Sequence, residues 1–283
     1  MNNFFLVIPT RNRLDYLSNL LLDLNAFKNN ISQVVIIDQS HNDISQEIAK
    51  LNLEYNFVFE KNSRNNSVNN SRNQALKHYN NEEWLFFLDD DLRIPAIAFD
   101  KILKHLEPNV IDVLIPGIGK EYLESKKIMY SSLLESLAKP NDFSKSRMRI
   151  QVCSGLSIAK ASIFLKAGFW FDENFSTWGD DWDFGMRLTN SGAIIYYQPD
   201  ILIEHLWIQS GGQRDKAKTI DFEFENQMLY FYFIRKHFSD KVIQNEFLLI
   251  LITNIYLSFK KFQFLNIFRC IKAFKKSKLI KIQ

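Results

Sequence analysis

One short segment limits the fold of this chain more than any other. The apolar run Trp84-Leu85-Phe86-Phe87-Leu88 ends directly in Asp89, Asp90 and Asp91. Five consecutive apolar residues predict a strand that is buried on both faces, as in a parallel sheet. Such a strand presents the residues after it at the edge of the sheet where open α/β folds bind ligands. Three neighbouring carboxylates repel one another, and a divalent cation would relieve that repulsion and bind phosphate. The segment therefore predicts a metal-dependent α/β enzyme.

The first 120 residues alternate between apolar strands and amphipathic helices. Strands are predicted at Phe4–Ile8, Val34–Ile37, Phe57–Phe59 and Val110–Pro116, and helices at Leu14–Leu24, Ile44–Leu51, Ser71–His78 and Pro95–His105. This alternation is typical of βαβ units and a parallel sheet. The second half is less regular, with strands at Ser154–Ala159 and Ala193–Tyr197 and helices at Ala161–Ala167, Asp180–Ser191 and Phe222–His237. The predicted class is α/β, with a mostly parallel central sheet flanked by helices and a C-terminal helical tail.

The overall composition is that of a globular protein, with 46% hydrophobic and 24% charged residues. Cys153 and Cys270 lie far apart in the sequence and match no metal or disulfide pattern, so we expect free thiols in a reducing compartment. The N-terminus enters a strand almost at once, without the basic and apolar regions of a secretory signal. The sequence has no stretch of about 20 uncharged apolar residues, so no transmembrane helix is predicted. These features indicate a cytoplasmic protein.

The net charge of +3 conceals an asymmetry between the body and the C-terminus. After Glu246 the chain has no acidic residue, so the eight basic residues there give residues 247–283 a charge of +8 and leave residues 1–246 at −5. Residues 260–283 carry apolar and basic side chains mostly on different faces of a predicted helix, a pattern typical of membrane-surface helices. They either bind the cytoplasmic face of the inner membrane peripherally or pack on the body with solvated lysines. The uncharged stretch 247–259 is expected to pack on the body.

Further charged residues follow the predicted strands. Asp38 ends the second strand, where an aspartate serves either as a ligand at the sheet edge or as a turn-forming residue. Arg11, Arg13, Arg64 and Arg72 lie in loops or at helix starts, where arginine can bind phosphate in a bidentate manner. For each of them a solvated surface position is the alternative. The loop after the first strand contains no glycine, which argues against a Rossmann dinucleotide site and against a P-loop.

A second acidic cluster lies in the segment Trp178-Gly179-Asp180-Asp181-Trp182-Asp183. The helix dipole favours acidic residues in a first turn, but it does not explain the flanking tryptophans. Aromatic rings beside carboxylates suit a sugar site, and an apolar wall raises the pKa of a carboxylate and makes it a better base. His205 follows another apolar run and is either a structural residue or a third metal ligand.

Seven segments, in this order and at this spacing, resemble the family 2 inverting glycosyltransferases of the GT-A fold. They are Leu6–Arg13, Val35–Asp38, Ser71–Leu76, Phe87–Asp91, Gly155–Ala159, Gly168–Phe175 and Gly179–Leu188. The resemblance covers residues 4–237 and includes Phe224–Lys236, which is similar to the closing helix of polysaccharide-building members. It implies a GT-A nucleotide-diphospho-sugar transferase domain at residues 1–237 and a basic amphipathic helical tail at residues 238–283.

The resemblance also implies roles for individual residues of this sequence. The nucleotide sugar would be bound by a set of residues near the sheet edge: Pro9, Thr10, Arg11, Asp38, Arg72, Asp89 and Asp90. Asp89 and Asp91 take the places of the DXD motif, and with His205 they would hold Mn²⁺ or Mg²⁺, Asp91 most directly. Asp181 takes the place of the catalytic base, and the acceptor would be contacted by Trp178, Asp180 and Trp182. The family usually has Glu where this chain has Asp180, which is one methylene shorter.

The implied function is inverting, metal-dependent transfer of a sugar from a nucleoside diphosphate sugar, with UDP as the default nucleotide and dTDP as the alternative. The expected acceptor is a hydroxyl of a glycan or of a lipid-diphosphate-linked saccharide in bacterial surface polysaccharide synthesis, and no nucleic-acid partner is expected. Two other functions stay open. One is a sugar-phosphate nucleotidyltransferase, although its glycine-rich first loop is missing, and the other is a non-catalytic carbohydrate- or membrane-docking subunit. Specificity is expected to depend on residues 118–150 and 205–220.

Overall fold

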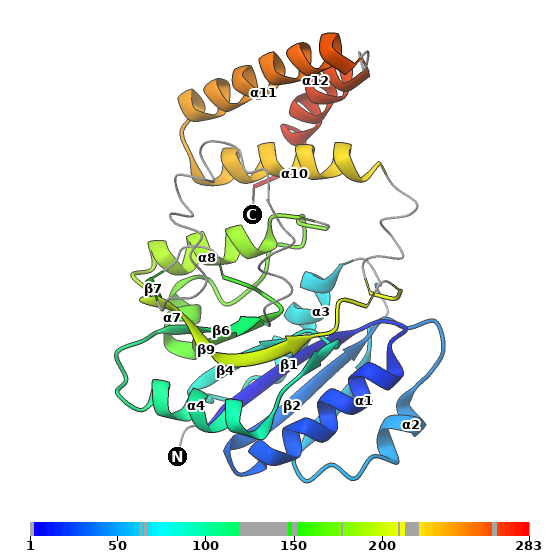
Figure 1. The fold of residues 1–283 in the computed structure, drawn as a ribbon, viewed down its shortest axis with the longest axis vertical. Coiled ribbons are helices and arrows are strands. Elements are labelled where there is room, and N and C mark those ends of the chain that lie inside the picture. Colours follow the sequence, from blue (N-terminus) through cyan, green and yellow to red (C-terminus); the bar gives the residue numbers. More distant parts are fainter. Residues whose placement is uncertain are drawn as a thin grey trace.

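The computed structural model describes residues 3–62, 64, 67–118, 147–148, 152–176, 178–208, 210–212, 221–261 and 265–282. Most of the two segments expected to set specificity, 118–150 and 205–220, therefore lies outside the described residues. The centre of the molecule is a nine-stranded sheet with the strand order β3-β2-β1-β4-β8-β6-β9-β5, in which β7 also pairs with β9 (Figure 1). The strands are β1 (Phe4–Thr10), β2 (Ile31–Asp38), β3 (Phe57–Lys61), β4 (Trp84–Leu88), β5 (Leu92–Arg93), β6 (Val113–Ile118), β7 (Arg147–Met148), β8 (Leu156–Lys160) and β9 (Ile195–His205).

The half of the sheet formed by β3, β2, β1 and β4 is parallel, and β6 is parallel to β9. β8 runs antiparallel to both of its neighbours, β4 and β6. The carboxyl ends of the parallel strands β1, β2 and β4 therefore meet at one edge of the sheet, which is where such folds bind ligands. The predicted α/β class is confirmed.

The two faces of the sheet bury two separate sets of side chains. In β1, Phe4, Leu6 and Ile8 pack with α1 (Leu14–Asp23) and α4 (Ala96–Leu106), whereas Phe5 and Val7 pack with α3 (Val68–Ala75), α7 (Ala161–Lys166) and α8 (Asp180–Asn190). This division follows from the alternation of side chains along a strand. All seven residues of β1 are buried because helices cover both faces. The shorter elements α2 (Ser45–Ala49), η1 (Leu24–Asn30) and η2 (Leu76–His78) connect these layers.

Two elements extend beyond the bounds that the sequence pattern predicts. α3 begins at Val68 instead of Ser71, because the side chain of Ser67 accepts a hydrogen bond from Asn70 N and caps the helix within a polar stretch.

β9 does not end before Pro199 but continues to His205. Its register with β6 shifts between Pro116 and Gly117, where a Cβ on Gly117 would lie 2.9 Å from the carbonyl oxygen of Pro199. The irregularity lets the strand pass the proline and carries His205 toward the edge at which β4 ends.

Three helices follow the sheet: α10 (Phe222–His237), α11 (Asp240–Lys261) and α12 (Leu265–Ser277), which lie above α8 in Figure 1. A third hydrophobic cluster joins them to the body, and it contains Phe175, Trp182, the residues Leu229–Ile234 of α10, and Cys270 and Ala273 of α12. Helix α12 therefore packs its apolar side on α10, as in the packing alternative for residues 260–283. The division into residues 1–237 and 238–283 stays a prediction. No helix within the described ranges is both long and apolar enough to cross a bilayer.

Candidate active site

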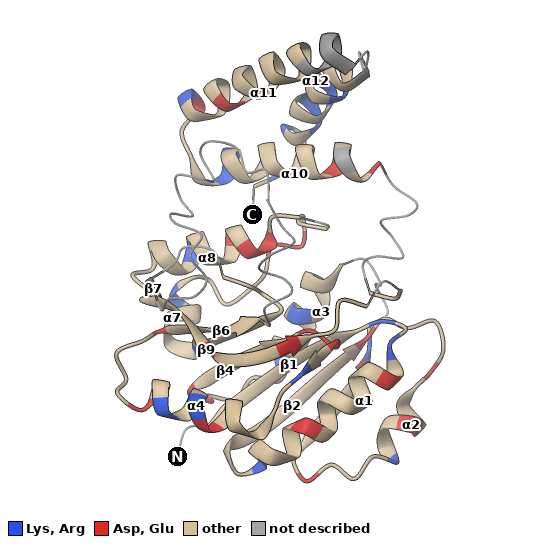
Figure 2. Ribbon diagram, in the orientation of Figure 1, with Lys and Arg blue, Asp and Glu red and all other residues tan. Residues whose placement is uncertain are grey.

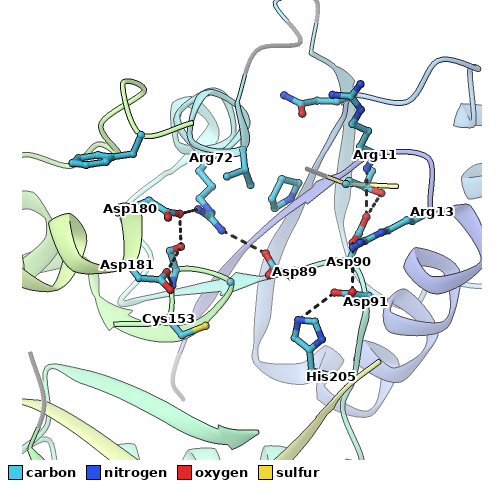
Figure 3. Close-up of a pocket in the computed structure, with 18 of the residues that line it drawn as sticks. Arg11, Arg13, Arg72, Asp89, Asp90, Asp91, Cys153, Asp180, Asp181 and His205 are labelled. Atoms are coloured by element: carbon cyan, nitrogen blue, oxygen red, sulfur yellow. Dashed lines mark hydrogen bonds and ion pairs between the residues drawn. The ribbon is translucent and has the colours of Figure 1, made fainter. Parts of the chain in front are cut away.

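A cleft of about 280 Å³ opens at the edge of the sheet where β1 and β4 end. Segments that are far apart in the sequence line it (Figure 3): Pro9, Thr10, Arg11, Arg13, Gln39, Val68, Arg72, Asp89, Asp90, Asp91, Cys153, Ser154, Gly155, Phe175, Ser176, Asp180, Asp181, His205 and Gly212. Among the site residues predicted from the sequence, all except Asp38, Trp178 and Trp182 line this one cleft. The fold thus brings the two acidic segments, 89–91 and 180–181, to a common cavity.

The three consecutive aspartates do not point in the same direction. Asp90 faces the loop after β1, where it accepts hydrogen bonds from Thr10 Oγ1 at 2.8 Å and Arg11 N at 3.4 Å and pairs with Arg13 Nη1 at 2.8 Å. Asp89 and Asp91 instead face the rest of the cleft (Figure 3). Because Arg13 also lies 3.2 Å from Asp91, the chain itself relieves part of the repulsion that the sequence argument left to a metal ion.

Asp90 is held mainly by the loop after β1. Burial raises the pKa of its carboxyl to about 6, although Arg13 and Thr10 favour the charged form. Arg13 in turn donates to the carbonyl oxygens of Ser210 and Ile208, so one guanidinium ties the loop after β1 to the segment after β9. The geometry therefore makes Asp90 and Arg13 the residues that shape this wall of the cleft.

Asp89, Asp91 and His205 form a group that could hold a metal ion. One ligand atom from each lies within 4.8 Å of the other two. Two carboxylate oxygens and one imidazole nitrogen suit Mn²⁺, and also Mg²⁺ when water completes its coordination. Gly155 is part of this arrangement, because a Cβ at that position would lie 2.1 Å from Asp89 Oδ2. The residues present therefore fit the predicted cation.

The segment after β9 orients His205. Trp207 N donates a hydrogen bond to His205 Nδ1 at 3.0 Å, and the two rings stack with their centroids 3.8 Å apart. Nε2 consequently faces Asp91 Oδ1, at 3.5 Å. A cation bound at Nε2 would require the ring proton to lie on Nδ1, and the hydrogen bond from Trp207 would then be lost.

Across the cleft in Figure 3, the start of α8 presents Asp180 and Asp181. Ser154 donates from both its backbone N and its Oγ to Asp181 Oδ1, each at 2.7 Å, and its Oγ also lies 2.9 Å from Asp180 Oδ2. Burial and the neighbouring Asp180 raise the pKa of Asp181 to about 7, against the opposing effect of the bonds from Ser154. A carboxylate with this pKa is suited to accept a proton near neutral pH.

Arg72 of α3 lies between the two acidic segments. Its Nη1 is 3.0 Å from Asp180 Oδ2 and its Nη2 is 3.5 Å from Asp89 Oδ1. The side chain is 3% exposed, so α3 holds the guanidinium in place at the floor of the cleft. A buried guanidinium in this position can bind phosphate oxygens in a bidentate manner.

Asp38 does not reach the cleft. It is fully buried at the end of β2, where it accepts a hydrogen bond from Ser40 N at 2.7 Å and pairs with Lys61 Nζ at 2.8 Å. Both of these interactions hold the local backbone, as in the turn alternative, and the nucleotide contact of Asp38 stays a prediction. The next residue, Gln39, lines the cleft instead.

The two tryptophans that flank the second acidic cluster also lie away from the cleft. Trp182 is 2% exposed and lies against Phe233 of α10, with ring centroids 6.5 Å apart. Trp178 packs on Tyr230 and Phe233 of the same helix. Helix α10 covers α8, and both rings belong to or pack against the third hydrophobic cluster. The predicted acceptor contacts of the two tryptophans did not take this helix into account.

Several lining residues were not assigned to the site from the sequence, among them Gln39, Ser154, Gly155 and Ser176. A single serine, glutamine or glycine carries no signal in one sequence, because these residue types occur in every kind of loop. Cys153 also lines the cleft, but burial raises the pKa of its thiol, so it stays neutral and is not a nucleophile at ordinary pH.

The chain is similar to one protein family model and to several solved structures. A family model described as Glycosyl transferase family 2 matches residues 5–164. No curated protein matches the chain. Residues 1–349 of TarS from S. aureus, solved with UDP-GlcNAc, are similar at 18% identity and a TM-score of 0.60, over 90% of this chain and 72% of that one.

Two other solved structures are similar to a smaller extent. A longer S. aureus TarS structure has 20% identity and a TM-score of 0.54, over 90% of this chain and 43% of that one. GalNAc-T7, solved with UDP, GalNAc and Mn²⁺, has 13% identity and a TM-score of 0.59, over 83% of this chain and 48% of that one. At these identities the likeness concerns the fold, and the chain spans less than half of these two proteins.

Proposed function

The chain belongs to glycosyl transferase family 2, and we propose that it is an inverting enzyme that transfers a sugar from a nucleoside diphosphate to a hydroxyl group of a glycan or lipid-linked saccharide. The family, the GT-A fold and the enzyme class agree with the expectations from the sequence. UDP is the proposed nucleotide, with dTDP as the alternative, and surface polysaccharide synthesis is the proposed pathway. The UDP and UDP-GlcNAc bound to similar folds support the choice of UDP.

One observation supports this proposal most strongly: Asp181 and the group formed by Asp89, Asp91 and His205 line the same cleft, with Arg72 between them. A diphosphate carries charge that needs a positive partner, and Arg72 is the cation at the centre of the cleft. Pro9, Thr10 and Arg11 at the end of β1 are proposed as further donor contacts. Mn²⁺ or Mg²⁺ is the proposed cofactor, and the Mn²⁺ found with GalNAc-T7 supports this choice.

The proposed reaction is a single displacement. The acceptor oxygen forms a bond to the anomeric carbon while the bond to the diphosphate breaks on the opposite face, so the configuration inverts. Asp181 accepts the hydroxyl proton. Within the described part of the chain, both hydrogen bonds to its side chain fall on Oδ1, so Oδ2 is the oxygen that takes the proton. When bound, a divalent cation neutralises the leaving diphosphate.

The cellular setting forms the remaining part of the proposal. We place the enzyme in the cytoplasm, where nucleotide sugars would be its donors. A lipid-diphosphate-linked acceptor would require peripheral contact with the inner membrane, which is one of the two alternatives that the sequence pattern leaves open for residues 260–283. The basic C-terminal segment supports this setting, since it carries +8 and no acidic residue.

A donor screen followed by two variants tests the proposal. Thermal shift with a panel of UDP- and dTDP-sugars in Mn²⁺ identifies the donor, and transfer of labelled sugar to oligosaccharide acceptors is then measured. Asp181→Asn is expected to lower kcat by about 10²–10⁴-fold, since it removes a general base, while donor affinity stays near that of the wild type. Asp91→Ala is expected to lose the Mn²⁺-dependent part of donor binding in calorimetry. Asp100→Asn, an exposed residue of α4, serves as the control.

Each outcome bears on a different part of the proposal. Near-normal turnover of Asp181→Asn would show that another group takes the proton. Label recovered in a nucleotide instead of an oligosaccharide would indicate a nucleotidyltransferase. Equal donor affinity of the wild type with and without Mn²⁺ would show that donor binding does not depend on the metal.

A further inference from the structure

One side of α11 is not covered by the rest of the described chain. Leu248, Leu249, Ile252, Ile255 and Tyr256 are 55%, 45%, 54%, 37% and 63% exposed. Their spacing places them on one side of the helix, and together they are called the α11 face here. The other side of the helix is packed: Phe247 stacks on Phe274 of α12 with ring centroids 4.1 Å apart, and Ile250 and Leu251 join the third hydrophobic cluster.

The α11 face differs from an ordinary scatter of exposed apolar residues. Its five members are large and adjacent, whereas single exposed apolar side chains on a protein surface need no explanation. In Figure 2 the charged residues of the coloured part of α11 lie in its first turns, and Figure 1 shows the helix at the end of the molecule, across α10 from the sheet. A contiguous exposed apolar surface of this kind indicates a site that contacts another protein or a membrane.

The charge of the surrounding segment decides which contact this is. Residues 247–283 carry +8 with no acidic residue. The exposed lysines of α12 and of the turn after it are Lys272, Lys275, Lys276 and Lys278; Lys272 and Lys276 lie over Phe224 of α10, and Lys278 lies over Phe274, which stacks on α11. A second copy docked on the α11 face would bring two such segments together and would be opposed by their repulsion. Anionic lipid head groups would instead be attracted. Tyr256 suits the same boundary, because its ring is apolar and its hydroxyl is polar.

We propose that the α11 face docks peripherally on an anionic lipid bilayer. The sequence pattern leaves both a membrane contact and packing on the body open for residues 260–283, and in the structure α12 uses Cys270, Ala273 and Phe274 to pack on α10 and α11. Among the apolar residues of α12 whose side chains are described, Phe268 stays strongly exposed, at 70%. The contact therefore moves to α11, where the apolar side chains face solvent, and α12 contributes the charge. This inference adds to the proposed function, because it names the surface of the protein that would contact the membrane carrying a lipid-linked acceptor.

Vesicle flotation of the full chain tests the proposal without measuring transfer, so its failure is distinct from a failure of the proposed enzyme activity. The vesicles are phosphatidylcholine alone, or phosphatidylcholine mixed with phosphatidylglycerol. The wild type is expected to float with the mixed vesicles only, and less at high salt. The double variant Leu248→Glu/Ile252→Glu is expected to lower the partition coefficient more than about tenfold, since two apolar side chains are lost from the contact.

Ile97→Glu is the matched control, because Ile97 is an apolar residue of α4 with 60% exposure outside the α11 face. It introduces the same charge and is expected to leave flotation unchanged. Unchanged thermal unfolding of both variants shows that they are folded. The proposal is overturned if the wild type floats with neither kind of vesicle, or if Ile97→Glu lowers flotation as much as the double variant. It is also overturned if sedimentation shows a dimer of the wild type that the double variant abolishes.

Discussion

At Gly155, the lack of a side chain decides where a carboxylate can lie. The residue precedes β8, and Asp89 at the end of the neighbouring strand β4 fills the space that a Cβ would take. Ser154 next to it binds Asp181 through two donors, and Arg13 holds Asp90. The chemistry of the cleft thus depends on small residues that a search for acidic and basic side chains does not find.

We expect Gly155→Ala to weaken cation binding. The added methyl group would lie 2.1 Å from Asp89 Oδ2 and 2.3 Å from its Cγ, so the carboxylate must leave the position in which it forms a group with Asp91 and His205. A loss of one ligand should lower Mn²⁺ affinity at least about tenfold, as measured by calorimetry. Gly192→Ala is the contrasting variant: nothing lies within 4 Å of its Cβ, but its φ of +87° strains any side chain. It should lower stability and leave Mn²⁺ affinity unchanged, and equal affinity of Gly155→Ala and the wild type would contradict the assignment.

The pKa of Asp181, raised to about 7, predicts the pH dependence of transfer. The charged form acts as base, so kcat/KM should fall about tenfold per pH unit below pH 7. In Ser154→Ala one of the hydrogen bonds that stabilise the charged form is lost, so the pKa of Asp181 should rise further and the acid limb should move to higher pH. Ser162→Ala, at an exposed position, is the control and should leave the profile unchanged. An identical profile for Ser154→Ala would mean that Asp181 is not the titrating group.

At the scale of elements, the position of α8 depends on α10. Asp183 in the first turn of α8 is 1% exposed and accepts from Lys236 at 2.8 Å and His237 at 2.9 Å, both at the end of α10, and from Arg187 at 2.9 Å. Lys236 also pairs with Asp172 at 2.7 Å. Because Asp180 and Asp181 belong to the same helical turn, this buried network orients the proposed base with respect to the cleft.

Asp183→Asn should destabilise the protein by about 3 kcal/mol, because it leaves buried cations without their partner. Burial alone would raise the pKa of Asp183, but His237, Arg187 and Lys236 outweigh it and hold the pKa below its usual range. The stabilisation is therefore complete above the ordinary aspartate pKa and is lost as the pH falls below it. Urea unfolding of wild type and variant should differ at pH 7, and the difference should shrink progressively as the pH falls below about 4. The exposed Asp100→Asn should differ by less than about 0.5 kcal/mol, and a constant difference at all pH values would rule out the ionised network.

At the scale of the whole molecule, the C-terminal helices are part of one packed structure with the body. Phe175 and Trp182 of the body share a hydrophobic cluster with α10 and α12. Arg235 of α10 donates to the carbonyl oxygens of Ser277 and Ile280, which holds the end of the chain against α10. The same packing that hides the two tryptophans from the cleft leaves the α11 face uncovered.

Two phenylalanines of α12 test this packing. Phe274 stacks on Phe247 and lies 5.3 Å from Phe231 between ring centroids, whereas Phe268 is 70% exposed. Phe274→Ala should lower the free energy of unfolding by about 2–4 kcal/mol, and Phe268→Ala should change it by less than about 0.5 kcal/mol. Chemical unfolding of both variants measures the difference. Equal and small effects would indicate that α12 does not pack on the body.

The sequence by itself determined the α/β class, the parallel strands and the segments that carry the acidic residues. These features are local: an apolar run that ends in carboxylates, or a helical period, is visible within ten residues. It also led to Asp89, Asp91, Asp181 and His205, which the structure brings to one cleft. Gly155 and Ser154 stayed hidden, because their importance depends on residues more than twenty-five positions away.

Only the tertiary structure decided which side chains share a surface. Asp38 and Trp182 are residue types that occur in binding sites, and both lie next to predicted site residues. In the structure Asp38 pairs with Lys61 and Trp182 packs on α10, and neither side chain lines the cleft. The sequence leaves residues 260–283 between a membrane surface and the body, and it predicts that residues 247–259 pack on the body. Packing on α10 buried the apolar side of α12 and left part of α11 exposed, because that choice depends on where two distant helices meet and not on either sequence alone.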